Sequence, residues 1–550
     1  MSGDFRLPGG HLPSWGMVVD LNRCVGCQTC TVACRSANDT LPGVQWRRVI
    51  DVELGRFPDV ERLFLVTGCQ HCEEPPCVPV CPTGATAKRA DGIVTQDYDL
   101  CIGCGYCAVA CPYQARTIAY ETAPAFAEGP TRHETAVAHP ERLGVAKKCN
   151  FCSGRVDAGL ARGLVPGVDP EATPACAAAC IADAIKFGDF NDPNSNVSRL
   201  SAANKTMVMH DQLGTKPKIR YLYETPAHPG RDTAPDESDA ADLASPLVGR
   251  RQQRWDFRAA MNFGLGGAGS GFAVIAYGLH LMGWLGVDAF RAALVVAGVF
   301  MAVGLFFVFL EIGRKLRFLN AMLRPQSSWM TREIYVVGVF YASVGASLLW
   351  PMPVLFGLAA AAAAAFLYCQ ARILNAGKGI PAWRVPLIRP MILATGLLEG
   401  AGIAGYANAL WLGSIKVASA VAWGGLVLIA LNAILWHSYR KSAAENGVPP
   451  LARADIEEAS PLIHGVGHVM AGALFAGGLS ADGFIAIALI ALGGTAAFAG
   501  GLIWKFVVIT RACHTQGFAL PKVPRRGSGN KAAPVSAGAL AVGRAATAGD

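Results

Sequence analysis

Charged residues are scarce in this chain: Asp, Glu, Lys and Arg make up 16% of the 550 residues, whereas 52% are hydrophobic. This composition is too apolar for an ordinary soluble protein. The chain also lacks a conventional nucleophile motif and a phosphate-binding loop. A G-x-G-x-x-G match at Gly264, Gly266 and Gly269 follows no predicted strand, so close helix packing explains it better than a dinucleotide site does.

The first residues of the sequence contain neither a twin arginine nor an apolar signal core. We therefore expect the N-terminal part of the chain to face the reducing cytoplasm. Disulfide bonds persist mainly in oxidising compartments. This expectation disfavours a disulfide framework for the 18 cysteines of the chain.

Sixteen of the cysteines fall into four tight groups. The groups are Cys24, Cys27, Cys30 and Cys34; Cys69, Cys72, Cys77 and Cys81; Cys101, Cys104, Cys107 and Cys111; and Cys149, Cys152, Cys176 and Cys180. Two residues between thiolates allow three sulfurs of one loop to face one cubane, and the fourth cysteine of such a run binds the other cluster in two-cluster ferredoxins. The ligand count predicts four [4Fe–4S] clusters.

Structural zinc is the main alternative, because paired C-x2-C motifs also bind zinc. Zinc does not require three cysteines in one C-x2-C-x2-C loop, which occurs twice here. Iron–sulfur clusters are therefore favoured. Cys369 and Cys513 lie outside the groups, and Cys369, in an apolar segment, is expected to be a packed thiol.

The distribution of apolar residues divides the chain into four parts. Residues 1–225 predict an α+β, ferredoxin-like domain with several clusters, 226–250 a Pro/Ala/Asp-rich linker, and 511–550 a basic, disordered cytoplasmic tail. Residues 251–510 predict an all-α bundle with eight transmembrane helices, since eight apolar segments approach bilayer-spanning length. These segments are 262–285, 289–311, 334–350, 352–374, 387–411, 415–437, 462–479 and 483–508.

Lys and Arg gather in the loops on one side of these segments, whereas the opposite loops carry only Arg291 and Lys416. Positive loops face the cytoplasm, so the asymmetry predicts a multi-pass protein with both termini and the cluster domain in the cytoplasm. The same loops account for the formal charge of +8, and nothing in the charge pattern suggests nucleic acid as a partner.

Ionisable residues inside apolar segments are costly and are usually functional. Most of them lie near the cytoplasmic ends, where cytoplasmic clusters could exchange electrons with a membrane quinone. Glu311, Arg332, Glu333 and His468 are the candidate quinone-binding residues; the alternative is interfacial charges that extend to water. Glu399 lies near mid-depth, as a proton-path residue or a packed neutral acid. No haem is expected, because His464 and His468 are four residues apart on one helix face and cannot both be axial to one haem.

The N-terminal domain resembles the four-cluster iron–sulfur subunit of dimethyl-sulfoxide-reductase-type molybdoenzyme complexes. The resemblance is carried by RCVGCQTCTVACR (23–35), CQHCEEPPCVPVCPTGA (69–85), CIGCGYCAVACPY (101–113), and KKCNFCSGRV (147–156) with PACAAACIADAI (174–185). More loosely, 251–510 resembles the eight-helix membrane anchor of these complexes, through LEIGRKLRFLN (310–320), SSWMTREIY (327–335) and LLEGAG (397–402). The chain therefore looks like a fusion of two subunits.

The resemblance implies a crosswise assignment of the cysteines to clusters. Its four sets are Cys24, Cys27 and Cys30 with Cys180; Cys149, Cys152 and Cys176 with Cys34; Cys101, Cys104 and Cys107 with Cys81; and Cys69, Cys72 and Cys77 with Cys111. It also implies that the Cys24 set meets the catalytic partner and that the Cys69 set lies nearest the membrane. The position of Glu311 is a quinol-linked histidine in some relatives, and Glu333 matches an acidic position.

The function that the resemblance implies is electron transfer and membrane anchoring in a quinone-linked molybdenum or tungsten oxidoreductase. Its molybdopterin-binding catalytic subunit is a separate chain, and the complex lies in the inner membrane of a bacterium or archaeon. A cytoplasmic cluster domain favours a dehydrogenase that reduces ubiquinone or menaquinone. Two alternatives are the equivalent component of a quinone-linked hydrogenase or disulfide-reductase-like complex, and a non-redox membrane protein with structural zinc domains.

Overall fold

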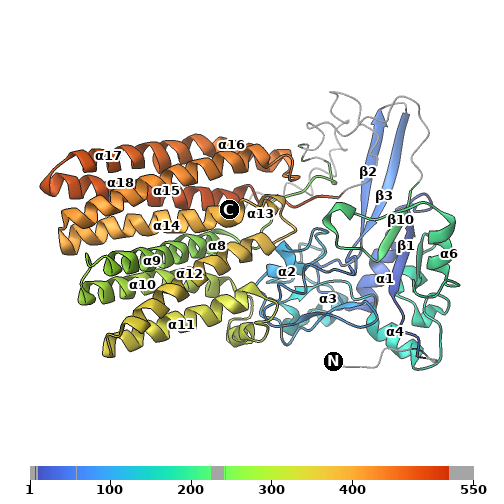
Figure 1. The fold of residues 1–550 in the computed structure, drawn as a ribbon. Helices are drawn as coiled ribbons and strands as arrows, with labels where there is room; N and C mark the ends of the chain where they lie inside the picture. The colour runs from blue at the N-terminus through green and yellow to red at the C-terminus, as the bar shows by residue number, and fades with distance from the viewer. Residues whose placement is uncertain are drawn as a thin grey trace.

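The computed structural model describes residues 10–56, 59–223 and 245–518, together with Leu7, Ala241 and Leu243. The chain forms an N-terminal α+β domain (residues 10–223) and a helical domain (residues 255–511), which lie end to end in Figure 1. The two-domain fold class that the sequence predicts is confirmed. Most of the predicted linker (226–250) and of the predicted tail (511–550) lies outside the described residues.

A four-stranded mixed sheet forms the side of the N-terminal domain farthest from the helical domain (Figure 1). Its strands, in spatial order, are β8 (Ile185–Asp189), β1 (Trp15–Asp20), β10 (Ile219–Leu222) and β9 (Thr206–Met207). β1 pairs in parallel with β10, with Met17 opposite Ile219, and antiparallel with β8. This register joins the beginning of the domain to its end and buries both residues completely.

The other elements of this domain are short, because cysteines occupy much of its interior. The strands are β2 (Arg48–Arg56), β3 (Asp59–Thr67), β4 (Thr86–Lys88), β5 (Val94–Gln96), β6 (Thr117–Ile118) and β7 (Ala146–Lys147). The helices are α1 (Thr29–Ala37), α2 (Tyr106–Val109), α3 (Arg132–Ala136), η1 (Pro140–Arg142), α4 (Ser153–Leu160), η2 (Pro170–Ala172), α5 (Ala175–Ala178), α6 (Asn196–Ala203) and η3 (Asp211–Leu213). The β2–β3 hairpin projects from the domain (Figure 1).

The helical domain consists of long helices that run roughly side by side, together with short helices and turns that connect or extend them (Figure 1). They are α8 (Phe257–Met261), η4 (Asn262–Gly266), α9 (Gly267–Leu281), α10 (Val287–Glu311), η5 (Lys315–Met322), α11 (Trp329–Leu349), α12 (Pro353–Ala376), α13 (Pro381–Arg384), α14 (Ile388–Ala407), η6 (Asn408–Leu412), α15 (Ile415–Ser442), α16 (Pro450–Leu462), η7 (Ile463–Met470), α17 (Ala471–Ser480), α18 (Gly483–Phe506) and η8 (Val507–Arg511). Of these, η4, η6, η7 and η8 are π-helical turns.

Seven helices within the described residues are long and apolar enough to cross a membrane, one fewer than the sequence predicts. They are Phe257–Leu281, Val287–Glu311, Trp329–Leu349, Pro353–Ala376, Ile415–Ser442, Pro450–Ser480 and Gly483–Arg511. The predicted span 387–411 forms α14 and η6, which are long enough together but contain Glu399, Asn408 and several glycines. These polar residues are buried against neighbouring helices, so α14 is a less apolar, interior helix.

Residues 511–518, which the sequence assigns to a disordered tail, pack against the described end of the predicted linker. The amide of Phe518 donates to the carbonyl of Leu247, and the amide of Thr515 donates to that of Arg250. His210 of the N-terminal domain lies 3.0 Å from the carbonyl of Gly517. This segment therefore connects the helical domain back to the N-terminal domain.

The two domains meet through tight backbone contacts that involve three glycines. A Cβ atom on Gly313, just after α10, would meet the carbonyl oxygen of Gly144 at 2.2 Å, and one on Gly103 would meet the same oxygen at 1.9 Å. Gly103 and Gly144 also have positive φ angles, +73° and +66°, which other residues rarely adopt. The junction therefore depends on the absence of side chains at these positions.

We expect Gly313→Val to weaken the contact between the domains. The added side chain overpacks the junction, which costs about 1–3 kcal/mol, so the thermal unfolding temperature of the detergent-solubilised protein should fall. Gly338→Val on α11 is the matched control, since a Cβ there meets nothing within 4 Å. Equal unfolding temperatures for the two variants would contradict the prediction.

Candidate functional site

The loops that carry the grouped cysteines share a left-handed backbone. Positive φ angles occur at Gly26 and Gln28 in the first group, at Gly103 and Gly105 in the third, and at Cys152 in the fourth. Such turns curl a loop around one point and direct successive amides inward. Amides do reach the sulfurs: those of Phe151, Thr86, Ala146 and Ala184 lie 3.3–3.5 Å from Cys149, Cys81, Cys101 and Cys180, respectively.

The first and fourth groups lie together. Burial raises the pKa of the Cys24 thiol, and so do two neighbouring sulfurs, those of Cys180 and Cys27. Burial also raises the pKa of Cys34 to about 12, with further contributions from the sulfurs of Cys176 and Cys152. Cysteines far apart in the chain are therefore near neighbours, and the last cysteine of each group lies beside the other group.

The second and third groups interact in the same way. Burial raises the pKa of the Cys72 thiol, and so do the sulfurs of Cys69, Cys77 and Cys111. Burial likewise raises the pKa of the Cys104 thiol, and so do the sulfurs of Cys107, Cys81 and Cys101. Cys111 therefore lies beside the second group, and Cys81 lies beside the third.

The donor set fits iron–sulfur clusters. All 18 cysteines are free thiols rather than disulfides. The amide donors to sulfur described above are suited to an anionic cluster.

Buried cations also lie beside the cysteines. No motif in the sequence indicates them. The guanidinium of Arg116 is 3.1 Å from the sulfur of Cys77, and that of Arg47 is 3.7 Å from the sulfur of Cys176. Both side chains are almost fully buried. An uncompensated charge is costly in such a place, so these cations indicate that the site holds negative charge.

We expect Arg116→Met to make the potential of the adjacent cluster more negative, because removal of a buried positive charge disfavours the more negative reduced state. A shift of about 60 mV corresponds to a tenfold change in a one-electron equilibrium. Redox titration followed by electron paramagnetic resonance measures it. Arg116→Lys retains the charge and should restore most of the potential, whereas equal potentials for Arg116→Met and the unchanged protein would contradict this role.

The expectation that the Cys69 set lies nearest the helical domain is wrong. The carbonyl of Cys104 accepts a hydrogen bond of 3.1 Å from the indole of Trp255, just before α8. In the same loop, the carbonyl of Ile102 accepts from the amide of Arg314. Cys69 and Cys72 instead pack in the core that contains the four-stranded sheet. The Cys101–Cys107 loop makes the close contact because its glycines allow backbones to approach.

A cavity lies where this loop meets the helices. It is lined by Cys104, Trp255, Ala259, Asn262, Phe263, Val308, Glu311, Ile312, Met330, Glu333 and Ile373. The cavity is narrow, about 30 Å³, which is enough for a water molecule. A larger planar ring can enter only if lining side chains move, and the unbranched side chain of Met330 is suited to that movement.

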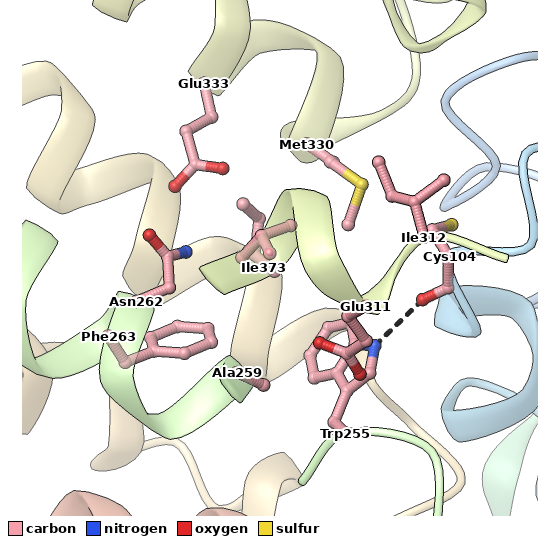
Figure 2. Close-up of a pocket in the computed structure, with 11 residues that line it drawn as sticks. Cys104, Trp255, Ala259, Asn262, Phe263, Glu311, Ile312, Met330, Glu333 and Ile373 are labelled. Atoms are coloured by element: carbon pink, nitrogen blue, oxygen red, sulfur yellow. Dashed lines mark hydrogen bonds between the residues drawn. The ribbon is translucent and has the colours of Figure 1, made fainter. Parts of the chain in front are cut away.

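Three polar side chains in the cavity wall have an oxygen without a partner among the described residues: Asn262, Glu311 and Glu333. Each residue is at most 6% exposed. Figure 2 shows the Glu333 carboxylate and the Asn262 amide pointing toward one another, with Glu311 nearer Trp255. Buried polar atoms rarely remain unpaired, so this wall is suited to a ligand with its own polar atoms.

Glu311 also lines a second, larger space that is open to the surface. This basin of about 580 Å³ is lined by Tyr120, Arg258, Leu310, Glu311, Ile312, Gly313, Arg314, Lys315, Leu316 and Arg317. Glu311 and Ile312 therefore separate the narrow cavity from the basin. A carboxylic acid in this position can exchange a proton with either side.

Of the four residues predicted for a quinone site, the structure brings together Glu311 and Glu333. Arg332 is on the helix of Glu333 but donates to the backbone carbonyls of Pro325 and Gln326. His468 is on η7, 2.9 Å from the ring nitrogen of His464. Neither lines the cavity. Asn262 was not predicted, because an asparagine beside a glycine-rich segment gives no signal in the sequence.

Glu399 is packed and hydrogen-bonded inside the bundle. Its carboxylate accepts a 2.6 Å hydrogen bond from the ammonium of Lys505, and both side chains are completely buried. The two residues lie on α14 and α18, on adjacent helices of the bundle. Their pairing could not be inferred from residues more than 100 positions apart.

At the opposite end of the cysteine array, Cys27 is exposed. Apolar side chains beside the first and fourth groups are also exposed, namely Val25 (59%), Val32 (64%) and Ile181 (72%). Exposed apolar residues that cluster in this way are typical of a surface that binds another protein.

Comparisons with known proteins agree with this arrangement. The family described as a 4Fe–4S dicluster domain matches residues 60–126. A selenate reductase subunit from Mesobacillus selenatarsenatis is 43% identical over 222 residues, 38% of this chain and 71% of the relative. A putative dimethyl sulfoxide reductase iron–sulfur subunit from Halobacterium salinarum is 36% identical, over 44% of this chain and 95% of the relative. The iron–sulfur cluster-binding subunit of menaquinone reductase from Nitratidesulfovibrio vulgaris is 37% identical, over 38% and 88%.

Two of these relatives are named as iron–sulfur subunits, and all three match less than half of this chain. The seven apolar helices add a membrane-type domain to the same polypeptide. The chain therefore belongs to the family of iron–sulfur subunits of dimethyl-sulfoxide-reductase-type molybdoenzyme complexes.

Proposed function

We propose that this chain carries electrons between a molybdenum- or tungsten-containing catalytic subunit and membrane quinone, and that it anchors the complex in the membrane. Four [4Fe–4S] clusters would be held by the four crosswise sets of cysteines; when bound, they carry electrons one at a time. The catalytic partner transforms the substrate. The helical domain supplies the quinone site.

The observation that carries this proposal is the cavity between the Cys101–Cys107 loop and the helices. Cys104 and three buried polar side chains line it. A quinone ring in this cavity would be next to a cluster ligand, and Met330 would rotate to admit it. Asn262 can donate to one ring carbonyl, and Glu333 can exchange a proton with the ring oxygen.

The proton balance assigns a role to Glu311. Reduction of a quinone to a quinol consumes two electrons, which arrive from the cysteine array, and two protons. Glu311 separates the cavity from the open basin, so it is placed to pass protons inward from the side of the N-terminal domain. Electrons and protons would then enter from the same side, and turnover would not be electrogenic.

The exposed end of the array supports a catalytic partner. Val25, Val32 and Ile181 form an apolar surface around the exposed Cys27. Docking of the partner on this surface would place its redox centre beside the Cys24 set. The relatives include subunits of selenate and dimethyl sulfoxide reductases, which supports a molybdoenzyme partner rather than a hydrogenase.

The proposal also includes the orientation of the chain in the membrane and the direction of electron flow. The clustering of Lys and Arg in the loops on the side of the N-terminal domain favours a cytoplasmic location for that domain and for both termini. The membrane would be the inner membrane of a bacterium or archaeon. With clusters in the cytoplasm, we propose that electrons flow from the substrate to quinone, as in a dehydrogenase.

The test uses the detergent-purified complex, isolated anaerobically through this chain with its partners. Elemental mass spectrometry should find about sixteen iron atoms per chain beyond the share of the partner, with about one molybdenum or tungsten. Zinc in place of iron would overturn the cluster assignment, and nickel would point to a hydrogenase partner.

The quinone link is tested separately on the same preparation. The complex is reduced with dithionite, freed of excess reductant, and mixed with a short-chain quinone. Recovery of the visible absorbance of the oxidised clusters is expected. Clusters that reoxidise with air but not with the quinone would show that the cavity serves another purpose.

A further inference from the structure

A buried ion pair in the helical domain lies close to the cavity. The ammonium of Lys505 on α18 is 2.6 Å from the Glu399 carboxylate on α14, and neither side chain is exposed. Burial of two charges costs several kcal/mol per ion before their attraction is counted. A pair of apolar residues would fill the same space without that cost, so the pair requires an explanation other than packing.

Lys505 makes a second contact that provides the explanation. Its ammonium donates to the carbonyl oxygen of Phe263 at 2.9 Å. On α12, the amide nitrogen of Gln370 donates to the carbonyl oxygen of Asn262 at 3.0 Å. Two side chains from different helices therefore bind consecutive carbonyls of η4. This turn is π-helical, a conformation found mostly as single turns at functional sites.

Two glycines admit these side chains. A Cβ atom on Gly266 would meet the Gln370 amide nitrogen at 2.8 Å, and one on Gly267 would meet the Lys505 ammonium at 2.9 Å. Neither glycine has a positive φ angle, so space rather than backbone conformation accounts for them. The glycine-rich segment that imitates a dinucleotide motif in the sequence thus gives Lys505 and Gln370 access to the turn.

The turn held in this way forms part of the cavity wall. Asn262 and Phe263 both line the cavity. The Asn262 side-chain oxygen has no partner among the described residues, and its amide points toward Glu333 in Figure 2. Gln370 and Lys505 thus bind the backbone of the two residues of this turn that line the cavity.

We propose that Lys505 and Gln370 are positioning residues for the quinone ring. They hold η4 so that the Asn262 amide faces a ring carbonyl, while Glu399 neutralises the buried ammonium. The inference rests on the proposed quinone function. It assigns Lys505 and Glu399 to recognition of the ring rather than to proton movement through the bundle.

Two double variants separate hydrogen bonding from charge. In Lys505→Met with Glu399→Met, both charges and the donor to Phe263 are absent, and no ion is left unpaired. In Lys505→Gln with Glu399→Gln, the charges are absent but a donor of similar size remains. Ser460→Ala is the control, because it removes a buried 3.0 Å hydrogen bond to Trp436 in the same domain, away from η4.

The methionine variant is expected to raise the KM and the dissociation constant for a short-chain quinone about tenfold, with little change in kcat. Isothermal titration on the oxidised protein gives the dissociation constant without turnover. Amide hydrogen exchange over 257–270 should become faster. The glutamine variant and Ser460→Ala should both remain close to the unchanged protein.

Equal quinone affinity in the methionine variant and the unchanged protein would overturn this inference, and so would equal losses in the two double variants. A proton-path role predicts a different pattern, in which kcat falls in both double variants while affinity is retained. If the unchanged protein itself binds no quinone, the proposed function fails, and the positioning role for the ring fails with it.

Discussion

Cys104→Ser is expected to lower the rate of electron transfer to quinone by at least about 100-fold, since even residues that only support a metal ligand contribute 10–100-fold. Cys104 lies in the cavity wall, and Trp255 holds its carbonyl. A cubane with three thiolate ligands readily loses its fourth iron. We therefore expect a [3Fe–4S] signal in the electron paramagnetic resonance spectrum of the oxidised variant.

Cys369→Ser is the matched control, because Cys369 is a buried thiol on α12 outside the four groups. It should retain the iron content and the rate of the unchanged protein. Rapid mixing of the dithionite-reduced protein with quinone measures both variants. A normal quinone rate in Cys104→Ser would show that electrons leave through another set of cysteines.

Glu333→Gln is expected to lower kcat for quinone reduction about 100-fold, in the range that a positioned acid or base contributes. Glutamine keeps the shape of the side chain but cannot exchange a proton. Glu333 is 5% exposed, and one of its carboxylate oxygens has no partner among the described residues, so this oxygen is available to a ligand in the cavity. Steady-state kinetics with a short-chain quinone measures the effect.

Glu458→Gln is the control for this variant, since Glu458 is an exposed carboxylate on α16 that pairs with Arg511. Its kcat should be unchanged. The cluster signals of Glu333→Gln should also be unchanged, because Glu333 is not a cluster ligand. A loss of quinone affinity without a loss of kcat would assign Glu333 to binding rather than to proton transfer.

Local patterns identified much of this protein from the sequence. The C-x2-C-x2-C runs determine which cysteines share a loop, because thiolates two residues apart can face one point. Long apolar segments indicated the helical domain, since a bilayer imposes a minimum length. Glu311 and Glu333 were identified because a carboxylate at the end of an apolar helix is costly unless it has a use.

Contacts between distant segments could not be derived in this way. Asn262 reaches the cavity because Gln370 and Lys505 bind its turn from two other helices. Arg332 and His468 do not line the cavity with the carboxylates, because depth along a helix does not specify the direction in which a side chain points. The Cys101–Cys107 loop lies at the helices because Gly103, Gly144 and Gly313 allow three backbones to approach closely.

The sequence by itself determined the chemistry available to this protein: sixteen thiols in four groups, a membrane-type domain, and carboxylates near the ends of its apolar segments. The tertiary structure alone decided which cysteine set adjoins the cavity, which carboxylates share it, and which cation is paired inside the bundle. The physical reason is that spacing along a chain constrains only neighbours within a turn or a loop. Packing of residues more than 100 positions apart, as in Lys505 and Glu399, depends on the shapes of whole helices.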